Sequence, residues 1–580
     1  MKNTDIKKVF SRRFNISKLK KLEDTLKSLS LTEKTILGFF AVILALSTAI
    51  MLYKINDNFM IEIPEKGGSL TEGIIGTPRF INPLLAISNA DRDLSSLIYS
   101  GLMKATPEGE LVMDLAKEIN VSEDGLTYDV TLKDDIYFHD NTEITAEDIK
   151  FTIEKTQDSI IKSPKKANWN GVEIEKISDK EIRFILKTPY SPFLENTTLG
   201  ILPKHIWESV ASEQFAFSQL NIEPIGSGPY KIEKVKTNSS GILESYTLES
   251  FNKYALGEPY ISKITINLYP NEEKLVKAFE GGIVEGIGII STEKAEELNN
   301  KGKRIERTTL PRIFGLFLNQ NKNSIFTNME IRKALNKSLD KQKIIDEILN
   351  GYGVPINGPV PPSSSYFDAT TAENSLDIEG AIEILEKNGW KLNENRVREK
   401  TIKKVVTPFS FSISTSDAPE LKAVAEILKE QWKKIGAEVT IKIFEVGDLN
   451  QNVIRPRDYE SLLFGEIIGR DMDLFAFWHS SQRNDPGLNI ALYANINSDK
   501  LLEEVRSTSV EEDRLKKYIK FQEEITDDVP AIFIYSPDFT YVLPTKIKNF
   551  SMKQITMPSE RFLDVHNWNI ETNKIWKIFQ

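Results

Sequence analysis

Cysteine is absent from the 580-residue chain, and its absence excludes disulfide bonds, zinc–thiolate sites and thiol chemistry. It also excludes a lipid-modified cysteine as a membrane attachment. Histidine is scarce, since the chain contains only His139, His205, His479 and His566. These four are far apart in the sequence, so no local metal-ligand pair is present. We therefore expect neither a metal site nor a cofactor.

An excess of positive charge is also lacking, because the formal net charge is −10. A nucleic-acid partner would normally require a basic patch, so we expect none. The hydrophobic content of 40% and the charged content of 27% are ordinary for a soluble globular protein. A chain of this length has room for two or three domains with substantial cores.

The N-terminus is the exception to this acidic balance. Residues 1–34 carry ten Lys or Arg and four Asp or Glu, and residues 35–53 carry no charge. Nineteen apolar residues are long enough for one membrane-spanning helix, and the basic flank places the N-terminus in the cytoplasm and the remaining chain outside. A cleaved signal peptide is the alternative. We favour a retained anchor, because the basic segment is unusually long and no A-x-A cleavage site follows.

A strand, a turn and a helix are predicted in the stretch Asp124–Lys155. Apolar residues alternate with polar ones over residues 126–132, which is typical of a half-buried β-strand. The turn contains His139, Asp140 and Asn141. Thr145 then has the character of a helix N-cap, with acidic residues following in the first turn.

This stretch resembles the signature of family 5 solute-binding proteins, the peptide- and nickel-binding receptors of ABC importers. The family usually has Gly after the His-Asp pair, and here Asn141 takes its place; Asn tolerates a positive φ, so the turn is expected to persist. We expect His139 and Asp140 to hold the turn. A catalytic His-Asp pair is the alternative, although no Ser or Cys nucleophile stands in a recognisable motif.

The motif PIGSGPY at residues 224–230 is the most specific part of the resemblance. We expect its two glycines and its proline to force a tight turn into a strand. A phosphate-binding loop would also need a Lys and a following helix, which are missing. The resemblance as a whole covers roughly residues 66–570.

The resemblance implies an α/β fold of the class II periplasmic-binding-protein type, in which two lobes close on a ligand like a flytrap. The hinge strands are expected near Leu310-Pro311 and Phe539–Leu543. The expected segments are a basic cytoplasmic segment (1–34), a transmembrane anchor (35–53), a tether (54–66), lobe one (66–310) with an extra subdomain (about 95–205), lobe two (311–540) and a return to lobe one (541–580).

Peptide-binding members of the family hold an extended peptide through its backbone and pair its α-amine with a carboxylate of lobe two. The matching segment here is residues 465–481, in which Asp471 and Asp473 are the candidates and Asp471 is preferred. The match is imperfect, because Leu474 stands where the family has Pro. The alternatives are that Arg470 neutralises Asp471 or receives a ligand carboxylate.

Further candidate ligand contacts come from both lobes. Trp478 either stacks on the ligand or packs in the core. His479 is a weak candidate for nickel, because one imidazole without partners binds Ni²⁺ poorly. In lobe one, the family's first loop touches peptide through its backbone, and the matching residues are Arg79, Phe80, Ile81 and Asn82.

The resemblance therefore implies a membrane-anchored, monomeric receptor, extracellular or periplasmic, that delivers short peptides to an ABC importer permease. One alternative is the same fold used for another solute, such as a nickel complex or a sugar, or for peptide signalling without transport. An enzyme is the other, but no nucleophile elbow, zinc motif or paired-carboxylate arrangement is present in the sequence.

Overall fold

The computed structural model describes residues 16–367, 376–508 and 510–579. It forms two compact units, one of Met1–Glu65 with Glu571–Gln580 and the other of Lys66–Ile570. Residues 1–15, on which part of the predicted cytoplasmic segment falls, lie outside the described residues. Each unit is considered by itself.

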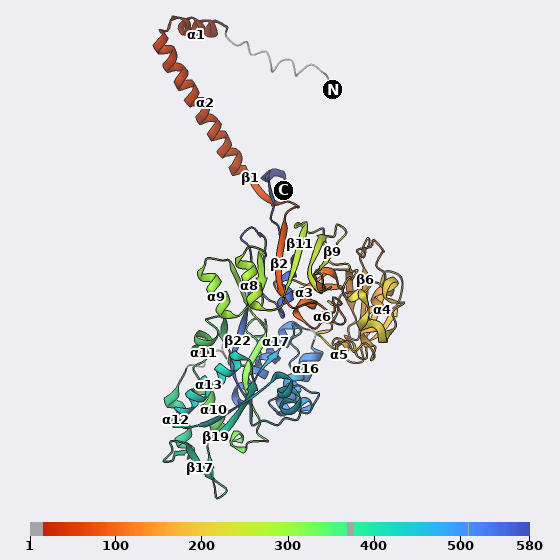
Figure 1. Cartoon of the computed structure of the whole chain (residues 1–580), viewed down its shortest axis with the longest axis vertical. Coiled ribbons are helices and arrows are strands. Elements are labelled where there is room, and N and C mark those ends of the chain that lie inside the picture. Colours follow the sequence, from red (N-terminus) through yellow and green to blue (C-terminus); the bar gives the residue numbers. More distant parts are fainter. Residues whose placement is uncertain (1–15, 368–375, 509, 580) are drawn as a thin grey trace. The chain divides into compact units, whose positions relative to one another are not determined.

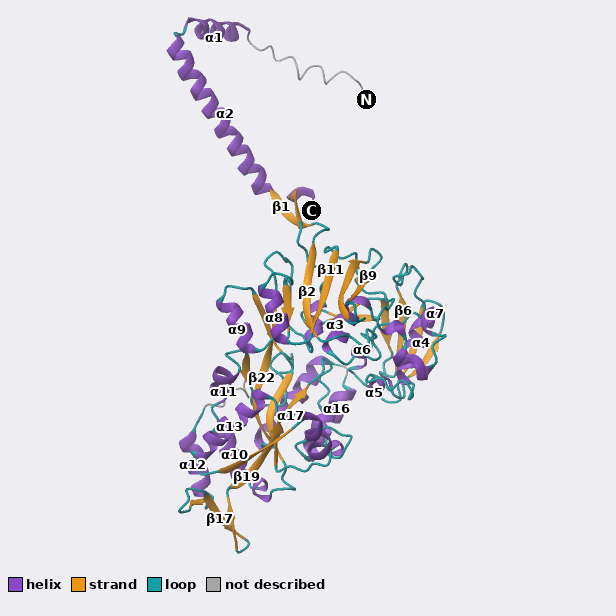
Figure 2. Cartoon of the chain, in the orientation of Figure 1, coloured by secondary structure: helices purple, strands orange, loops and turns teal. Residues whose placement is uncertain are grey.

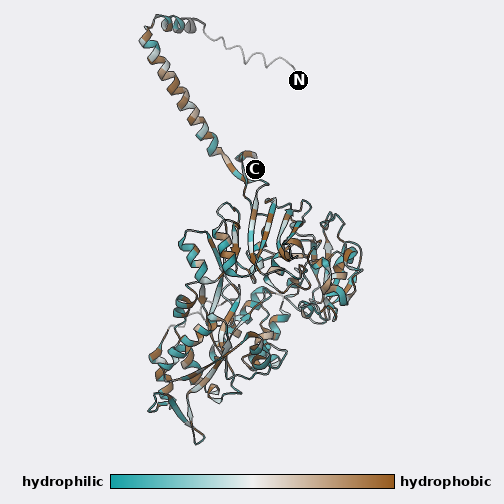
Figure 3. Cartoon of the chain, in the orientation of Figure 1, coloured by the Kyte–Doolittle hydropathy of each residue, from teal (hydrophilic) through white to brown (hydrophobic). Residues whose placement is uncertain are grey.

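The first unit contains helices α1 (Ile16–Ser28) and α2 (Leu31–Phe59), and strand β1 (Met60–Pro64) paired antiparallel with β23 (Thr572–Trp576). A capping box starts α2, in which the Glu33 carboxylate accepts from the Ser30 amide at 2.8 Å. Figure 3 shows the hydrophobic character of α2. Within the described ranges it is the single helix long and apolar enough to cross a membrane. The expected tether thus contains the end of α2 and β1.

The second unit is built on a twelve-stranded sheet. Its strands are β2 (Ser69–Ile75), β9 (Tyr230–Thr237), β10 (Leu243–Ser250), β11 (Lys263–Tyr269), β12 (Gly286–Gly288), β13 (Ile305–Thr309), β14 (Arg312–Leu318), β15 (Gly353–Pro355), β19 (Ser410–Ser416), β20 (Glu438–Phe444), β21 (Ser461–Ile467) and β22 (Ala531–Val542). Residues 531–537 of β22 pair with β14 and β15, and residues 538–542 pair with β12 and β13. This strand therefore belongs to both ends of the sheet (Figure 1).

We call the part built on β2 and β9–β13 lobe one and the part built on β14, β15 and β19–β21 lobe two. The buried apolar side chains follow the same division, since lobe one and lobe two have separate hydrophobic clusters. Helices of lobe one are α3 (Asn89–Ile98), α8 (Glu272–Glu280) and α9 (Thr292–Asn300). Helices of lobe two are α10 (Met329–Lys337), α11 (Lys341–Ile348), α12 (Ile378–Lys387), α13 (Pro419–Lys433), α14 (Val446–Asp448), α15 (Phe475–Trp478), α16 (Ile496–Ser507) and α17 (Glu511–Asp528).

The sheet of lobe two is covered on both faces (Figure 2). Along β14, Leu316 and Leu318 join the cluster under α10 to α13, whereas Ile313 and Phe317 join the cluster under α16 and α17. Successive side chains of a strand point to opposite faces, and β14 has no polar side chain from Ile313 to Leu318 because both of its faces are buried. This layering is that of an α/β fold.

Smaller sheets complete the unit. A subdomain of lobe one contains the sheet β5 (Ala116–Val121), β6 (Thr127–Leu132), β8 (Glu181–Ile185) and β7 (Glu173–Lys176) with helices α4 (Ala146–Gln157), α5 (Lys166–Trp169), α6 (Phe193–Asn196) and α7 (Lys204–Trp207). The hairpin β3 (Met103–Ala105) with β4 (Leu111–Met113) lies in lobe one, and β16 (Lys391–Leu392), β17 (Arg398–Ile402) and β18 (Val405–Pro408) form a sheet in lobe two.

The predicted strand–turn–helix is confirmed as β6, the turn and α4. Asn141 has φ 70°, and the Asp148 carboxylate accepts from the Thr145 amide at 2.9 Å at the start of α4. His139 is buried and neutral, because burial lowers its pKa to about 4. Its Nε2–H donates to the Gly228 carbonyl at 3.1 Å, and its Nδ1 accepts from the Gly226 amide at 3.3 Å. The histidine therefore fastens the turn to the PIGSGPY motif, which is a structural role.

The two glycines of that motif serve a different purpose from the one expected. Neither has a positive φ, so a tight turn is not their reason. A Cβ on Gly226 would lie 2.1 Å from the Ile98 carbonyl oxygen, and a Cβ on Gly228 would lie 2.6 Å from the Ile98 carbonyl carbon. The glycines are required because the end of α3 packs directly on this loop.

The chain returns to lobe one after β22, and a buried ion pair holds the return in place. Arg561 donates two hydrogen bonds to Asp93 on α3, at 2.9 and 2.8 Å, and contacts Glu72 on β2 at 3.2 Å. All three side chains are at most 1% exposed. The segment 543–570 is thus tied to both α3 and the central sheet.

Candidate ligand-binding site

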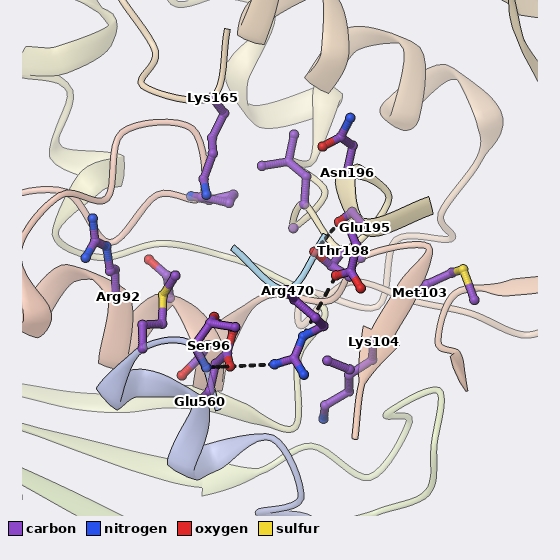
Figure 4. A pocket seen from close by; sticks show the side chains of 18 of the residues that line it. Arg92, Ser96, Met103, Lys104, Lys165, Glu195, Asn196, Thr198, Arg470 and Glu560 are labelled. Carbon is purple, nitrogen blue, oxygen red and sulfur yellow. Dashed lines mark hydrogen bonds and ion pairs between the residues drawn. The ribbon is translucent and has the colours of Figure 1, made fainter. Parts of the chain in front are cut away.

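A cavity of about 360 Å³ lies between the two lobes (Figure 4). Lobe two contributes Gly469, Arg470 and Asp471 from the loop after β21, and lobe one contributes the other lining residues. They belong to α3, β3, α5, α6, the loops next to these elements and the returning segment 556–563. Three residues of the predicted segment 465–481 therefore line the cavity.

Arg470 connects the two lobes at one end of the cavity. Its Nη2 donates to Glu560 of the returning segment at 2.5 Å, and its Nε lies 3.8 Å from the Glu195 carboxylate. Glu560 is in turn held by the amide and the hydroxyl of Thr556, at 2.6 and 2.7 Å. Arg470 thus pairs with lobe one, and the alternative in which it neutralises Asp471 is not the arrangement found.

The two candidate aspartates have different surroundings. Arg506 on α16 binds Asp473 with two of its guanidinium nitrogens, Nε at 3.0 Å and Nη2 at 2.6 Å. This bidentate geometry is the strong form of an arginine–carboxylate pair. Asp473 is therefore neutralised from within lobe two, and it does not line the cavity.

Asp471 lines the cavity, and its carboxylate accepts hydrogen bonds from the Tyr190 hydroxyl and from the Asp473 amide, each at 3.4 Å. Within the described part of the chain, no Lys, Arg or His side chain forms an ion pair with it. Burial raises its pKa, and the charge of Asp473 raises the pKa further. A buried carboxylate without a cation is destabilised, so a positively charged ligand group would stabilise it.

Glu195, Asp471 and Glu560 lie near one another at this end of the cavity. Burial raises the pKa of Glu195 to about 7, although Arg470 opposes the shift. Asp471 and Glu560 lie close enough to raise the pKa of Glu195 further. Glu195 and Glu560 therefore share Arg470, whereas Asp471 forms no ion pair in the described residues, which leaves Asp471 as the carboxylate that suits an ammonium ligand.

The predicted first-loop residues lie beside the cavity rather than on its wall. The amides of Arg79 and Phe80 donate to the Asp91 carboxylate at 2.7 and 2.9 Å, and the Ile81 amide donates to Asn221 at 2.8 Å. The Asn82 side chain is buried against Asn221. These four residues hold the loop so that the following Pro83 and Ala86 line the cavity. The amides of Arg79, Phe80 and Ile81 are therefore already used within the protein.

The structure also places Trp478 and His479 away from the cavity. Trp478 is fully buried and contacts Phe317 and Phe533, which is the core-packing alternative. His479 stacks on Phe475 with ring centroids 4.0 Å apart. Among the residues that the structure describes, no group of three or more His, Asp or Glu is placed to hold a metal ion.

Five cavity neighbours were not predicted from the sequence, namely Arg92, Lys165, Tyr190, Glu195 and Glu560. They come from separate loops and helices of lobe one, and none belongs to a sequence motif that indicates ligand contact. Only proximity in the folded chain brings them to Asp471.

Comparisons with known proteins agree with this fold. Residues 110–486 match the model of "Bacterial extracellular solute-binding proteins, family 5 Middle". The oligopeptide-binding protein AppA of Bacillus subtilis is 28% identical over 517 residues, which cover 87% of this chain and 92% of AppA. The nickel-binding periplasmic protein of Escherichia coli is 28% identical, over 69% of this chain and 75% of that protein.

Solved structures give the same result. AppA of Bacillus subtilis in complex with a nonapeptide has a TM-score of 0.66 at 27% identity, covering 88% of this chain and 100% of that one. The ABC transporter substrate-binding protein CtaP of Listeria monocytogenes has a TM-score of 0.74 at 26% identity, with coverage of 87% and 100%. The chain therefore belongs to the bacterial extracellular solute-binding proteins of family 5, and is a binding protein rather than an enzyme.

Proposed function

We propose that the chain captures short peptides with a free amino terminus between its lobes and delivers them to the permease of an ABC importer. The observation that carries the proposal is Asp471, a largely buried carboxylate on the cavity wall that forms no ion pair within the described residues. A peptide ammonium would supply the missing cation through a charge-assisted hydrogen bond.

The proposed cellular location of the chain is supported by its family and by helix α2. Family 5 proteins bind solutes outside the cytoplasmic membrane. We propose that α2 is a retained anchor, that residues 1–30 lie in the cytoplasm, and that the second unit works outside the cell as a monomer. The intact mass of protein extracted from native membranes tests the anchor, because a cleaved signal peptide would remove α2.

Lobe closure is part of the proposal. The hinge would consist of Leu310-Pro311 and of the middle of β22, where the strand leaves the sheet of lobe two and enters that of lobe one. A few backbone positions of this kind are enough for a hinge motion. Arg470, Asp471 and Tyr190 would then meet only when the lobes close.

The test uses the full-length chain in detergent micelles and isothermal titration calorimetry with tri-alanine and its N-acetylated form. We expect the wild type to prefer the free amine. Asp471→Asn is expected to weaken tri-alanine about 10- to 100-fold, since a hydrogen bond to a charged group contributes about 1.5–3 kcal/mol. Asp134→Asn, at an exposed aspartate of the subdomain, is the matched control. Equal affinity of the wild type for both peptides contradicts the proposal.

A further inference from the structure

The C-terminal strand of the chain lies in the first unit, beside the end of α2. Strand β23 pairs antiparallel with β1, and the register places Trp576 opposite Met60. Met60 directly follows Phe59, the last residue of α2. Lys574 of β23 donates to the Asp57 carboxylate of α2 at 2.6 Å. The chain therefore returns, near its C-terminus, to the place where the apolar helix ends (Figure 1).

Apolar side chains are exposed around this small sheet. Trp576 is 43% exposed, and Ile578, in the single 3-10 turn Lys577–Phe579, is 77% exposed. Phe59 is also exposed. The other six of the seven tryptophans are at most 2% exposed. Trp576 thus differs from every other tryptophan of the chain, and contact with an apolar or amphipathic surface would remove its exposed area from water.

The position of these side chains relative to α2 points to the membrane surface. The uncharged run of α2 ends at Tyr53, and Phe59 lies six positions further along the helix, about 9 Å at 1.5 Å per residue. The headgroup layer of a bilayer is about 5–8 Å thick on each side. Since β23 is antiparallel to β1, the chain after Trp576 continues past Met60 toward α2. Trp576 and Ile578 therefore come within reach of the headgroup layer.

We propose that β23 and the turn after it form a second membrane contact, in which Trp576 and Ile578 insert into the headgroup layer of the outer leaflet. The contact rests on the retained anchor proposed above. Tryptophan suits this layer because its ring is apolar and its N–H is polar. Lys577 is exposed between the two apolar residues, and its long side chain can place the ammonium among lipid phosphates.

The second unit is continuous with this sheet at both of its ends. It begins at Lys66, directly after β1 and Glu65, and it ends at Ile570, directly before β23. The Glu65 amide donates to the Glu571 carbonyl at 3.1 Å, which extends the pairing of the two strands. Two hydrogen-bonded strands, rather than one linker, therefore connect the second unit to the proposed anchor.

Trp576 itself reports on the contact, because the remaining tryptophans are buried. The full-length protein is reconstituted into vesicles of phosphatidylcholine and phosphatidylglycerol, with or without lipids brominated on the acyl chain near the headgroup. The vesicles are then floated on a density gradient. We expect brominated lipid to quench part of the wild-type fluorescence and Trp576→Phe to lose that quenchable part.

A second variant tests insertion with Trp576 in place. Ile578→Asp should reduce the quenching by brominated lipid, since a charge next to the tryptophan opposes its insertion. Ile160→Asp, at an exposed isoleucine of the subdomain, is the matched control and should leave the quenching unchanged. Equal quenching in Ile578→Asp and in the wild type contradicts the proposal.

The outcomes separate this contact from the proposed anchor. If the protein floats with the vesicles but brominated lipid quenches the wild type and Trp576→Phe equally, the contact is wrong and the anchor stands. If the protein does not float, the anchor is wrong and the contact with it. Aqueous iodide gives an independent measurement: quenching of Trp576 by iodide but not by bromine places it in water, and quenching by neither places it against protein. Either result overturns the contact with lipid.

Discussion

Asp471 and Asp473 are two residues apart, yet their surroundings give them different properties. Arg506 binds Asp473 with two nitrogens, whereas Asp471 faces the cavity with Tyr190 as its hydrogen-bond donor. Burial and the charge of Asp473 together raise the pKa of Asp471. The pair thus separates into one carboxylate that stabilises lobe two and one that is available to a ligand.

The raised pKa of Asp471 predicts how binding depends on pH. An ammonium ligand requires the ionised carboxylate, so affinity for tri-alanine should fall as pH decreases. The fall should begin at a higher pH than for an ordinary Asp, whose pKa is about 3.9. Calorimetry between about pH 4 and pH 7 measures this dependence. A tri-alanine affinity that is as pH-dependent in Asp471→Asn as in the wild type contradicts it.

Glu195 predicts a pH-dependent change in stability. Its pKa is about 7 in the folded protein, above the ordinary value of 4.5 for a glutamate, so between these limits the folded state binds more protons than the unfolded state. The free energy of unfolding therefore falls as pH rises through this window. Glu195→Gln removes the titrating group. The change in the free energy of unfolding that it causes should therefore be more favourable near pH 7 than near pH 4.5, by about 1–3 kcal/mol.

Urea unfolding at the two pH values measures the difference, with Glu123→Gln at an exposed position as the control. The same stability change for Glu195→Gln at both pH values would show that this carboxyl group does not titrate as described.

Site residues could be predicted only in part. Asp471 is indicated by the family pattern around residues 465–481, because that segment is continuous. Glu195 and Glu560 are 365 positions apart and meet through Arg470, which no local pattern encodes. Trp478 is a case in which the sequence allows two roles. An aromatic residue near a site can face a ligand or pack in the core, and in the structure Trp478 packs against Phe317 and Phe533.

At the scale of elements, local sequence patterns predicted a strand and a helix start correctly. The alternation over residues 126–132 gives β6, and Thr145 stands at the N-cap of α4. The purpose of Gly226 and Gly228 was not predictable, because the Ile98 carbonyl against which they pack lies on another element, α3. A glycine needed for close approach and one needed for a turn look alike in a sequence.

This contact makes Gly226→Ala a specific test of the packing of α3. The added methyl group would meet a backbone oxygen at 2.1 Å, and backbone cannot move aside as a flexible side chain can. Overpacking of this kind costs about 1–3 kcal/mol or more. Gly358→Ala, at a glycine with no atom within 4 Å of the new Cβ, should be close to neutral. Equal denaturation midpoints for the two variants would contradict the role assigned to Gly226.

In the second unit as a whole, the lobes meet through a small set of polar contacts. Besides Arg470 with Glu560, the Ser191 amide donates to the Arg506 carbonyl at 2.9 Å. The order of strands around β22 could not be derived from the sequence, because β22 pairs with strands more than two hundred residues away. The α/β class and the division into lobes could be predicted through the family resemblance.

Removing Arg470 should shift the lobes toward an open arrangement. In Arg470→Met, Glu195 and Glu560 would lose their shared cation and repel each other, so closure becomes less favourable. We expect a larger radius of gyration in solution scattering and at least about a tenfold loss of tri-alanine affinity, the loss that corresponds to 1.4 kcal/mol. Arg455→Met, at a mostly exposed arginine 3.8 Å from Asp485, is the control. An unchanged radius and affinity would contradict the bridging role.

The most direct test of the whole account is equilibrium dialysis of the full-length protein against an equimolar mixture of tri-alanine and its N-acetylated form, with the retained peptides quantified by mass spectrometry. The account predicts that tri-alanine is retained in clear excess over the acetylated form. Retention of no peptide, or equal retention of the acetylated and free forms, would contradict it.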